Sequence, residues 1–188
     1  MLYGTQTPRR RDAQRNRSAI VAAASEAMTT PRPAVGMSEI ARRAGVGQAT
    51  RYRHFPDRDA LTAAVIGYQI ERLELLIEAG QDDPACFRRV LAELLRTQIT
   101  MRPLVFLVRR MDPRARRRFE QRVLLTLTAP LRRAQECGLV RGDLVPSDLV
   151  LLFGMVEGVL DGAADAAAAR RSIDLALDGV FQASTTVT

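Results

Sequence analysis

The part of this 188-residue chain that most constrains its fold is residues 38–59, SEIARRAGVGQATRYRHFPDRD, which contain two short helical segments around a glycine turn. Ser38 is a residue type that accepts hydrogen bonds from the free N–H groups at the start of a helix, so we expect it to cap the first segment. Gly45 stands where a left-handed residue would end that helix. The second helix should begin at Gln48 and end before Pro56. This pattern predicts a helix-turn-helix unit.

The second predicted helix is rich in polar side chains that suit a nucleic-acid duplex. It offers hydrogen-bond donors, cations and an aromatic hydroxyl to base edges and phosphates. A short arginine-rich helix is often only a solvated face, and glycine-turned helix pairs also occur in proteins that bind no DNA. An arginine-rich N-terminal arm before the pair, and the sequence YRHFPDRDAL that leads into a long helix after it, favour DNA binding. The polar residues are Gln48, Thr50, Arg51, Tyr52, Arg53 and His54.

Residues 14–66 resemble the DNA-binding domain of the tetracycline-repressor (TetR) family, because SEIARRAGVGQATRYRHFPDRDAL is similar to that family's helix-turn-helix and the start of its fourth helix. The resemblance implies an all-α fold with a three-helix DNA-binding domain at residues 1–56. It also implies a larger helical domain for ligand binding and dimerisation at residues 57–188. The DNA-binding residues implied at the matching positions are Gln48, Ala49, Thr50, Tyr52, Arg53 and His54 in the major groove, with Arg58 near a phosphate.

Three positions in this helix leave alternatives open. Arg51 stands where the family usually has an apolar residue, so either its side chain reaches out to a phosphate or the helix is slightly rotated. Tyr52 could be a core residue instead of a DNA contact. His54 is the only histidine of the chain and could be a structural hydrogen-bonding residue. Its place beside Phe55, the expected core anchor of the helix, also puts it at an edge where a phosphate could be reached.

The positive charge is concentrated at the N-terminal end of the chain. Residues 1–60 hold 11 arginines and 5 acidic residues, whereas residues 61–188 hold 17 arginines and 16 acidic residues. Such an asymmetry attracts phosphates without regard to base sequence and makes the attraction sensitive to salt. It therefore indicates that the N-terminal end binds the polyanion.

Several other classes of protein are not expected. The chain has no catalytic Ser/His/Asp or Cys/His set outside the predicted helix pair, no metal-ligand cluster and no glycine-rich phosphate loop, so we expect no enzyme, no cofactor and no metal site. Cys86 and Cys137 should be free thiols, because their number and spacing fit neither a disulfide scaffold nor a zinc site. No apolar run is long enough for a membrane span, and residues 12–18 lack the apolar core of a signal peptide, which predicts a soluble cytoplasmic protein.

Helical patterns continue through the rest of the chain, divided by prolines and polar turns. We expect helices at residues 57–79 and 82–101, a short apolar helix from residue 103, and a long helix at 113–138 with a kink before Pro130. An effector cavity in this region could be lined by apolar side chains, although each of them could equally belong to an ordinary core. These residues are Tyr68, Leu104, Phe106, Phe119, Leu124 and Met155.

The segment that begins at Pro146 predicts a close contact between helices. Gly154, Gly158 and Gly162 recur every four residues and expose backbone along one helix face. A last helix at about residues 167–181 has Ile173 and Leu177 on one side. By resemblance, these two helices pair with their copies in a four-helix dimer interface. Alternatively, the glycines pack inside one subunit.

The expected function is that of a dimeric, sequence-specific regulator of transcription. Such a protein would bind a palindromic operator in double-stranded DNA as a repressor, and an unidentified small-molecule effector would release it. A non-specific architectural DNA-binding protein is a second hypothesis, although the nearly neutral residues 61–188 argue against the broad basic surface that it needs. A ligand-binding helical dimer without an operator is a third.

Overall fold

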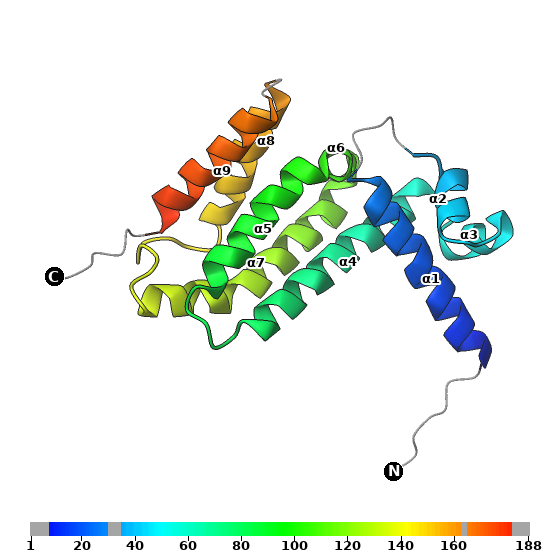
Figure 1. The fold of residues 1–188 in the computed structure, drawn as a ribbon, viewed down its shortest axis with the longest axis horizontal. Helices are drawn as coiled ribbons and strands as arrows, with labels where there is room; N and C mark the ends of the chain where they lie inside the picture. The colour runs from blue at the N-terminus through cyan, green and yellow to red at the C-terminus, as the bar shows by residue number, and fades with distance from the viewer. Residues whose placement is uncertain (1–7, 30–34, 163–164, 182–188) are drawn as a thin grey trace, which may run out of the picture. The chain divides into compact units, whose positions relative to one another are not determined.

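A computed structural model of the chain describes residues 8–29, 35–162 and 165–181, and these residues form nine α-helices (Figure 1). This confirms the predicted all-α fold. In chain order the helices are α1 (Pro8–Ala27), α2 (Met37–Arg43), α3 (Gln48–His54), α4 (Arg58–Ala79), α5 (Cys86–Thr100), α6 (Arg102–Arg110), α7 (Pro113–Glu136), α8 (Asp148–Asp161) and α9 (Ala166–Val180).

The helices belong to two compact units. The N-terminal unit comprises Met1–Tyr68 and Arg102–Arg110, and the C-terminal unit comprises Gln69–Met101 and Met111–Thr188. The boundary between functional domains expected at residues 56 and 57 stays a prediction. The first part of α4 belongs to the N-terminal unit and its second part to the C-terminal unit, and α6 belongs to the N-terminal unit.

In the N-terminal unit, α1, α2 and α3 pack against one another in pairs. One face of α1 is buried, since Ile20, Ala23, Ala24 and Ala27 are all at most 7% exposed. Ile40 and Ala41 on α2, Phe55 after α3, and Leu61 and Val65 on α4 are buried as well. Helices α1, α2 and α4 and the residue that follows α3 therefore contribute the buried apolar side chains of this unit.

Helix α2 ends where the sequence predicts, but it begins at a different residue. Gly45 has φ +67°, the left-handed conformation expected at the end of α2, and the next amide, that of Val46, donates to the Ala41 carbonyl at 3.0 Å. Ser38 was expected to cap α2, but this prediction is wrong. Gly36 is the cap residue and Ser38 lies inside the first turn, because the helix already begins at Met37.

The C-terminal unit is built around α5, which packs against α7, α8 and α9. Phe87, Val90, Leu91 and Leu95 give α5 a fully buried face. Figure 1 shows α8 and α9 running side by side, and these two helices pack against each other as well as against α5. The second part of α4 is joined to α7 by a bidentate ion pair, in which the Arg122 guanidinium donates to the Glu74 carboxylate at 2.9 Å.

The long helix α7 begins and continues as its sequence predicts. The Asp112 side chain accepts hydrogen bonds from the amides of Arg114 and Ala115 at 2.9 and 3.1 Å, and Pro113 occupies the first turn, where a missing N–H costs nothing. Pro130 lies inside the helix and is buried. Since proline has no N–H, it cannot donate to the Thr126 carbonyl, and helical structure continues around this position.

No described helix is both long enough and apolar enough to cross a membrane.

The left-handed glycine at the end of α2 leads to a stability prediction with an internal control. Gly45→Ala should lower the free energy of unfolding by about 1–2 kcal/mol, because an L side chain is strained at positive φ although no atom lies within 4 Å of the added Cβ. Gly67→Ala, inside α4 and also in open space, should instead raise it by about 0.5–1 kcal/mol. Urea denaturation of both variants measures the difference, and effects of the same sign would contradict the prediction.

Candidate nucleic-acid interface

Helix α3 displays most of its predicted DNA-binding side chains at the surface of the N-terminal unit. Gln48, Ala49 and Arg53 are exposed, and Tyr52 is 60% exposed. The alternative that Tyr52 is a core residue is therefore excluded. Thr50 and His54 are half-buried, so only part of each side chain is accessible from outside.

The core anchor of α3 is Phe55, as predicted. It is 2% exposed, and its backbone leaves the helical conformation and ends α3 before Pro56. The guanidinium of Arg17 on α1 lies over the Phe55 ring, 5.2 Å from its centroid, and the His54 ring lies 6.5 Å from it. These contacts attach the C-terminal end of α3 to α1.

Arg51 was predicted as a DNA-binding residue, but in this structure it points inward. It is only 4% exposed, and its Nη1 donates to the Phe55 carbonyl at 3.1 Å. Its Nη2 donates to Oε1 of Gln48 at 3.4 Å, and its guanidinium lies over the Tyr52 ring, 3.5 Å from the centroid. Arg51 thus occupies the buried position at which the family usually has an apolar residue. Helix α3 is therefore not rotated in a way that would expose Arg51.

Two of the predicted contacts are also engaged within the protein. The Nε2 of Gln48 donates to the Ser38 carbonyl of α2 at 3.4 Å, in addition to the contact of its Oε1 with Arg51. Arg58, at the start of α4, donates from Nη2 to the Val35 carbonyl at 3.0 Å and is partly buried. Gln48 and Arg58 are therefore held in place by hydrogen bonds before any duplex is present.

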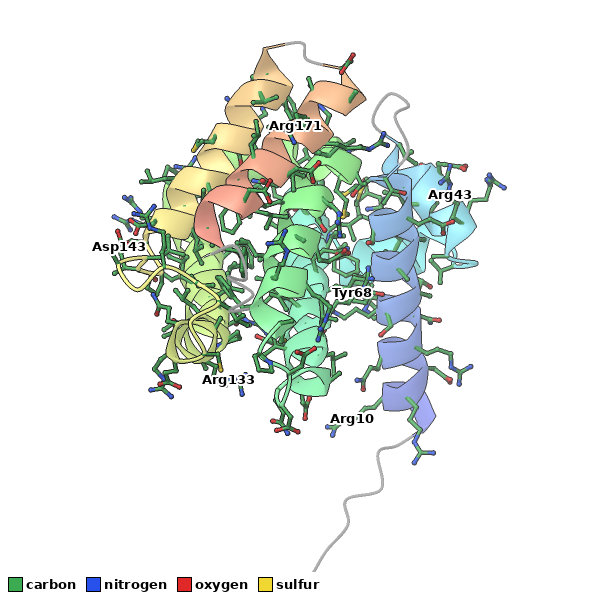
Figure 2. The ribbon with its side chains drawn as sticks, turned by 60° about the vertical axis from the view of Figure 1, so that its left-hand side comes forward. Arg10, Arg43, Tyr68, Arg133, Asp143 and Arg171 are labelled. Atoms are coloured by element: carbon green, nitrogen blue, oxygen red, sulfur yellow. The ribbon has the colours of Figure 1, made fainter. Side chains whose placement is uncertain are left out.

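Exposed arginines also lie on α1 and α2 of this unit. On α2, Glu39 forms ion pairs with Arg42 and Arg43. The hydrogen bond from Arg42 has the largest effect on the Glu39 carboxyl and that from Arg43 the next largest, and together they lower its pKa to about 2. Arg10 and Arg15 are exposed on the first half of α1. In Figure 2 the Arg10 side chain projects away from α1. The unit therefore combines a polar helix with surrounding cations, as a phosphate-binding surface requires.

The residues predicted for an effector cavity are divided between the units. Tyr68, Leu104 and Phe106 belong to the N-terminal unit, where Leu104 is buried and Phe106 is 57% exposed. Phe119, Leu124 and Met155 belong to the C-terminal unit, where the first two are half-buried and Met155 is 62% exposed. That these six residues line one cavity stays a prediction.

The residues predicted for a dimer interface separate into two groups. A Cβ added at Gly154 or Gly158 would meet no atom within 4 Å, so neither glycine packs closely against another helix of its own chain. Near Gly162 the only close atoms are backbone oxygens of α8 itself. In contrast, Ile173 and Leu177 are 2% and 4% exposed in the core of the C-terminal unit. That these five residues form a dimer interface stays a prediction.

Sequence reasoning missed several exposed apolar side chains on α8 and α9. Val150 and Leu151 on α8 are 40% and 66% exposed, and Leu175 on α9 is 55% exposed. The missed signal is that α8 is apolar on nearly all sides (DLVLLFGMVEGVLD), whereas one subunit can bury only one stripe of a surface helix.

Neither cysteine takes part in a site. Cys86 is a buried free thiol and Cys137 an exposed one. Among the described residues, no three histidine, cysteine or acidic side chains come together as metal ligands would.

Comparison with known proteins gives consistent matches. Residues 19–65 match the family model described as bacterial regulatory proteins, tetR family. The TetR transcription regulatory protein from Mycobacterium vanbaalenii is 29% identical over 93% of this chain and 100% of that chain, with a TM-score of 0.68. A TetR transcriptional regulator from Streptomyces coelicolor is 26% identical over 89% of this chain and 99% of that chain, with a TM-score of 0.64.

A third solved structure, that of RolR in complex with the ligand resorcinol, shares the fold. It is 24% identical over 90% of this chain and 89% of that chain, with a TM-score of 0.58. No curated protein matches the sequence.

The segment that matches the family model is the one that contains the helix pair described above. Residues 19–65 contain α2, α3 and the start of α4, which are the elements that present the polar helix. The similarity to the first two regulators extends over nearly the whole of each chain. The chain therefore resembles bacterial transcriptional regulators of the TetR family, in the segment at residues 19–65 that matches the family model and in its helical fold.

Proposed function

We propose that this regulator is a dimeric, sequence-specific repressor that reads its operator with α3. The observation that carries the proposal is the display of exposed polar side chains on a short helix whose inner side is fixed to α1 and α2. Tyr52 and Arg53 are exposed on this helix and are assigned to the major groove. Ala49, exposed beside them, suits contact with a thymine methyl group.

The surrounding arginines supply the part of the affinity that does not depend on base sequence. Arg10 and Arg15 on α1 and Arg42 on α2 are exposed cations in the same unit as α3. Each cation that neutralises a phosphate releases a condensed counterion, so operator affinity should fall as salt is raised. These contacts would fix the position of the protein on the duplex, whereas α3 would specify the sequence.

The proposed dimer interface is the exposed apolar face of α8. Leu151 and Met155 are apolar side chains more than half exposed in one copy, and the neighbouring Gly154 and Gly158 leave open space beside them. Small residues let a second helix approach closely, and the apolar side chains around them supply the buried area. A two-fold dimer would then present two copies of α3 to two half-sites about one helical turn, ~34 Å, apart.

The proposed effector is a small molecule that binds among helices of the C-terminal unit. Support comes from the shared fold with RolR, whose structure holds resorcinol, and from the half-buried Phe119 and Leu124 on α7. Because α4 contributes residues to both units, a ligand that changes the direction of this helix would change the separation of the two reading helices. The operator-bound state would lose population to the ligand-bound state.

Selection of bound sequences from a random duplex pool at physiological salt tests the reading surface. The expected result is a palindromic motif, and binding without any sequence preference would favour the architectural hypothesis instead. Against the selected operator, Thr50→Ala and Tyr52→Phe should each weaken binding by about 1–3 kcal/mol, because each removes a hydroxyl group from the proposed contacts. Thr100→Ala, an exposed threonine of α5, is the control and should bind like the unsubstituted protein. Unchanged affinity in both α3 variants would contradict the assignment of α3.

The dimer interface is tested by adding bulk where one copy has room for it. Gly158→Leu should leave the fold intact, because no atom lies within 4 Å of the added Cβ, but it should block close approach of a second α8. Analytical ultracentrifugation should therefore find a shift from dimer towards monomer. Gly142→Leu, in the loop before α8 and equally uncrowded, should not change the association. A Gly158→Leu variant that dimerises as well as the unsubstituted protein would contradict this interface.

The effector proposal predicts reciprocal coupling between ligand and operator. A small aromatic compound that raises the melting temperature of the free protein, with resorcinol as the first probe, should weaken operator binding. Saturating operator should weaken binding of the compound by the same factor, because the two equilibria are linked. Fluorescence anisotropy of a labelled operator and calorimetric titration of the compound measure the two factors. A bound compound that strengthens operator binding, or leaves it unchanged, would contradict the release mechanism.

A further inference from the structure

Helix α3 buries one charged side chain, that of Arg51. Arg51 is 4% exposed, and it is the only charged residue among the buried residues that the structure describes. No carboxylate forms an ion pair with it in the described part of the chain, and its Nε has no hydrogen-bond partner. Burial of a cation without an anionic partner is costly, whereas an apolar side chain of similar length would fill the same space without that cost. The contacts of the guanidinium indicate what offsets this cost.

The guanidinium connects the two ends of α3. Its Nη2 donates to Gln48, the first residue of the helix, and its Nη1 donates to the carbonyl of Phe55, the residue that follows the last turn. A helix of seven residues is too short to be stable by its own hydrogen bonds. Arg51 therefore ties together a segment whose ends would otherwise separate easily.

The same guanidinium also fixes the ring of Tyr52. The Arg51 carbon Cζ lies 3.5 Å from the ring centroid, at stacking distance, while Tyr52 stays 60% exposed. A cation over one ring face is attracted by the π electrons and restricts the ring to few orientations. The rest of the side chain, with its hydroxyl group, remains accessible. A side chain that is already ordered loses less entropy when it binds a partner.

Gln48 is oriented in a comparable way. Its Oε1 accepts from Arg51 and its Nε2 donates to the Ser38 carbonyl, so the direction of the amide group is defined in the free protein. Both hydrogen bonds are long, at 3.4 Å each, so a base edge can compete with them. Two exposed side chains of α3 thus depend on one buried cation.

We propose that Arg51 is a positioning residue for DNA recognition, which orders Tyr52 and Gln48 from beneath α3 and thereby sets the sequence preference without contacting a base. The inference rests on the proposed function of α3 as the reading helix. It differs from a purely structural role, because a structural residue would affect stability and all DNA binding alike, whereas a positioning residue affects discrimination between sequences.

The test compares Arg51→Met with Tyr52→Ala and with the double variant. Arg51→Met keeps an unbranched side chain in the buried site and removes the donors and the charge. Each variant is taken through the same selection from a random duplex pool, and affinities for the selected operator and for an unrelated duplex are measured at one salt concentration. Arg96→Met, which removes one exposed charge from α5 in the C-terminal unit, controls for the change in net charge.

Arg51→Met should bind the operator about tenfold less tightly, a loss typical of one base contact, with affinity for the unrelated duplex within about twofold of the unsubstituted protein. Its selected motif should lose preference at the base positions that Tyr52→Ala also relaxes. In the Tyr52→Ala background, Arg51→Met should have a much smaller effect, because the group through which it acts is absent. Arg51→Lys, which keeps the charge but not the planar fork, should bind the operator with intermediate affinity.

Three results would overturn the inference. An unchanged motif and affinity for Arg51→Met would show that DNA recognition does not depend on the contacts of the guanidinium with Tyr52 and Gln48. Equal losses for operator and unrelated duplex, with a lower melting temperature, would show a structural role, and Arg51→Leu provides a second apolar variant to confirm this. Full additivity with Tyr52→Ala would show that Arg51 does not act through Tyr52. Failure of the reading surface itself is distinct, because Tyr52→Ala would then leave the selected motif unchanged.

Discussion

The packing of α3 against α1 and α2 is the constraint on which the rest of the N-terminal unit depends. A helix of seven residues has too few internal hydrogen bonds to persist alone, so its conformation comes from the burial of Phe55 and Arg51 on its inner side. The left-handed Gly45 sets the point at which the chain turns from α2 towards α3. Once the inner side is fixed in this way, the outer side is free to carry polar residues chosen for a partner instead of for the fold.

The C-terminal unit differs from the N-terminal unit in that one of its helices, α8, is apolar on nearly all sides. Leu149, Val156 and Leu160 bury one face of α8 in the core around α5, while Leu151 and Met155 remain at the surface. Exposed apolar area of this kind is a cost in an isolated subunit and a source of affinity in an assembly. The two units thus expose different kinds of surface, a polar one on α3 and an apolar one on α8.

The sequence was sufficient for the helices and for Gly45, but not for the direction of every side chain. Helical periodicity identified the apolar side of α9, yet it could not tell that Ile173 and Leu177 fill the subunit's own core. Ser38 was taken as a cap because its residue type is favoured there, but Gly36 is the cap residue and the helix begins two residues earlier than a Ser38 cap implies. Arg51 was expected outside because charge usually avoids the interior, and only coordinates reveal that Phe55 and Gln48 receive its donors.

The different burial of the two thiols makes the molecule easy to label at one position. Cys86 is 3% exposed, while Cys137 is exposed at the end of α7, so a maleimide reagent would attach once per chain without any substitution. In the proposed dimer, the two attached groups would be related by the two-fold axis. The distance between a pair of spin labels at these sites would then report directly on how the C-terminal units rearrange when an effector or an operator binds.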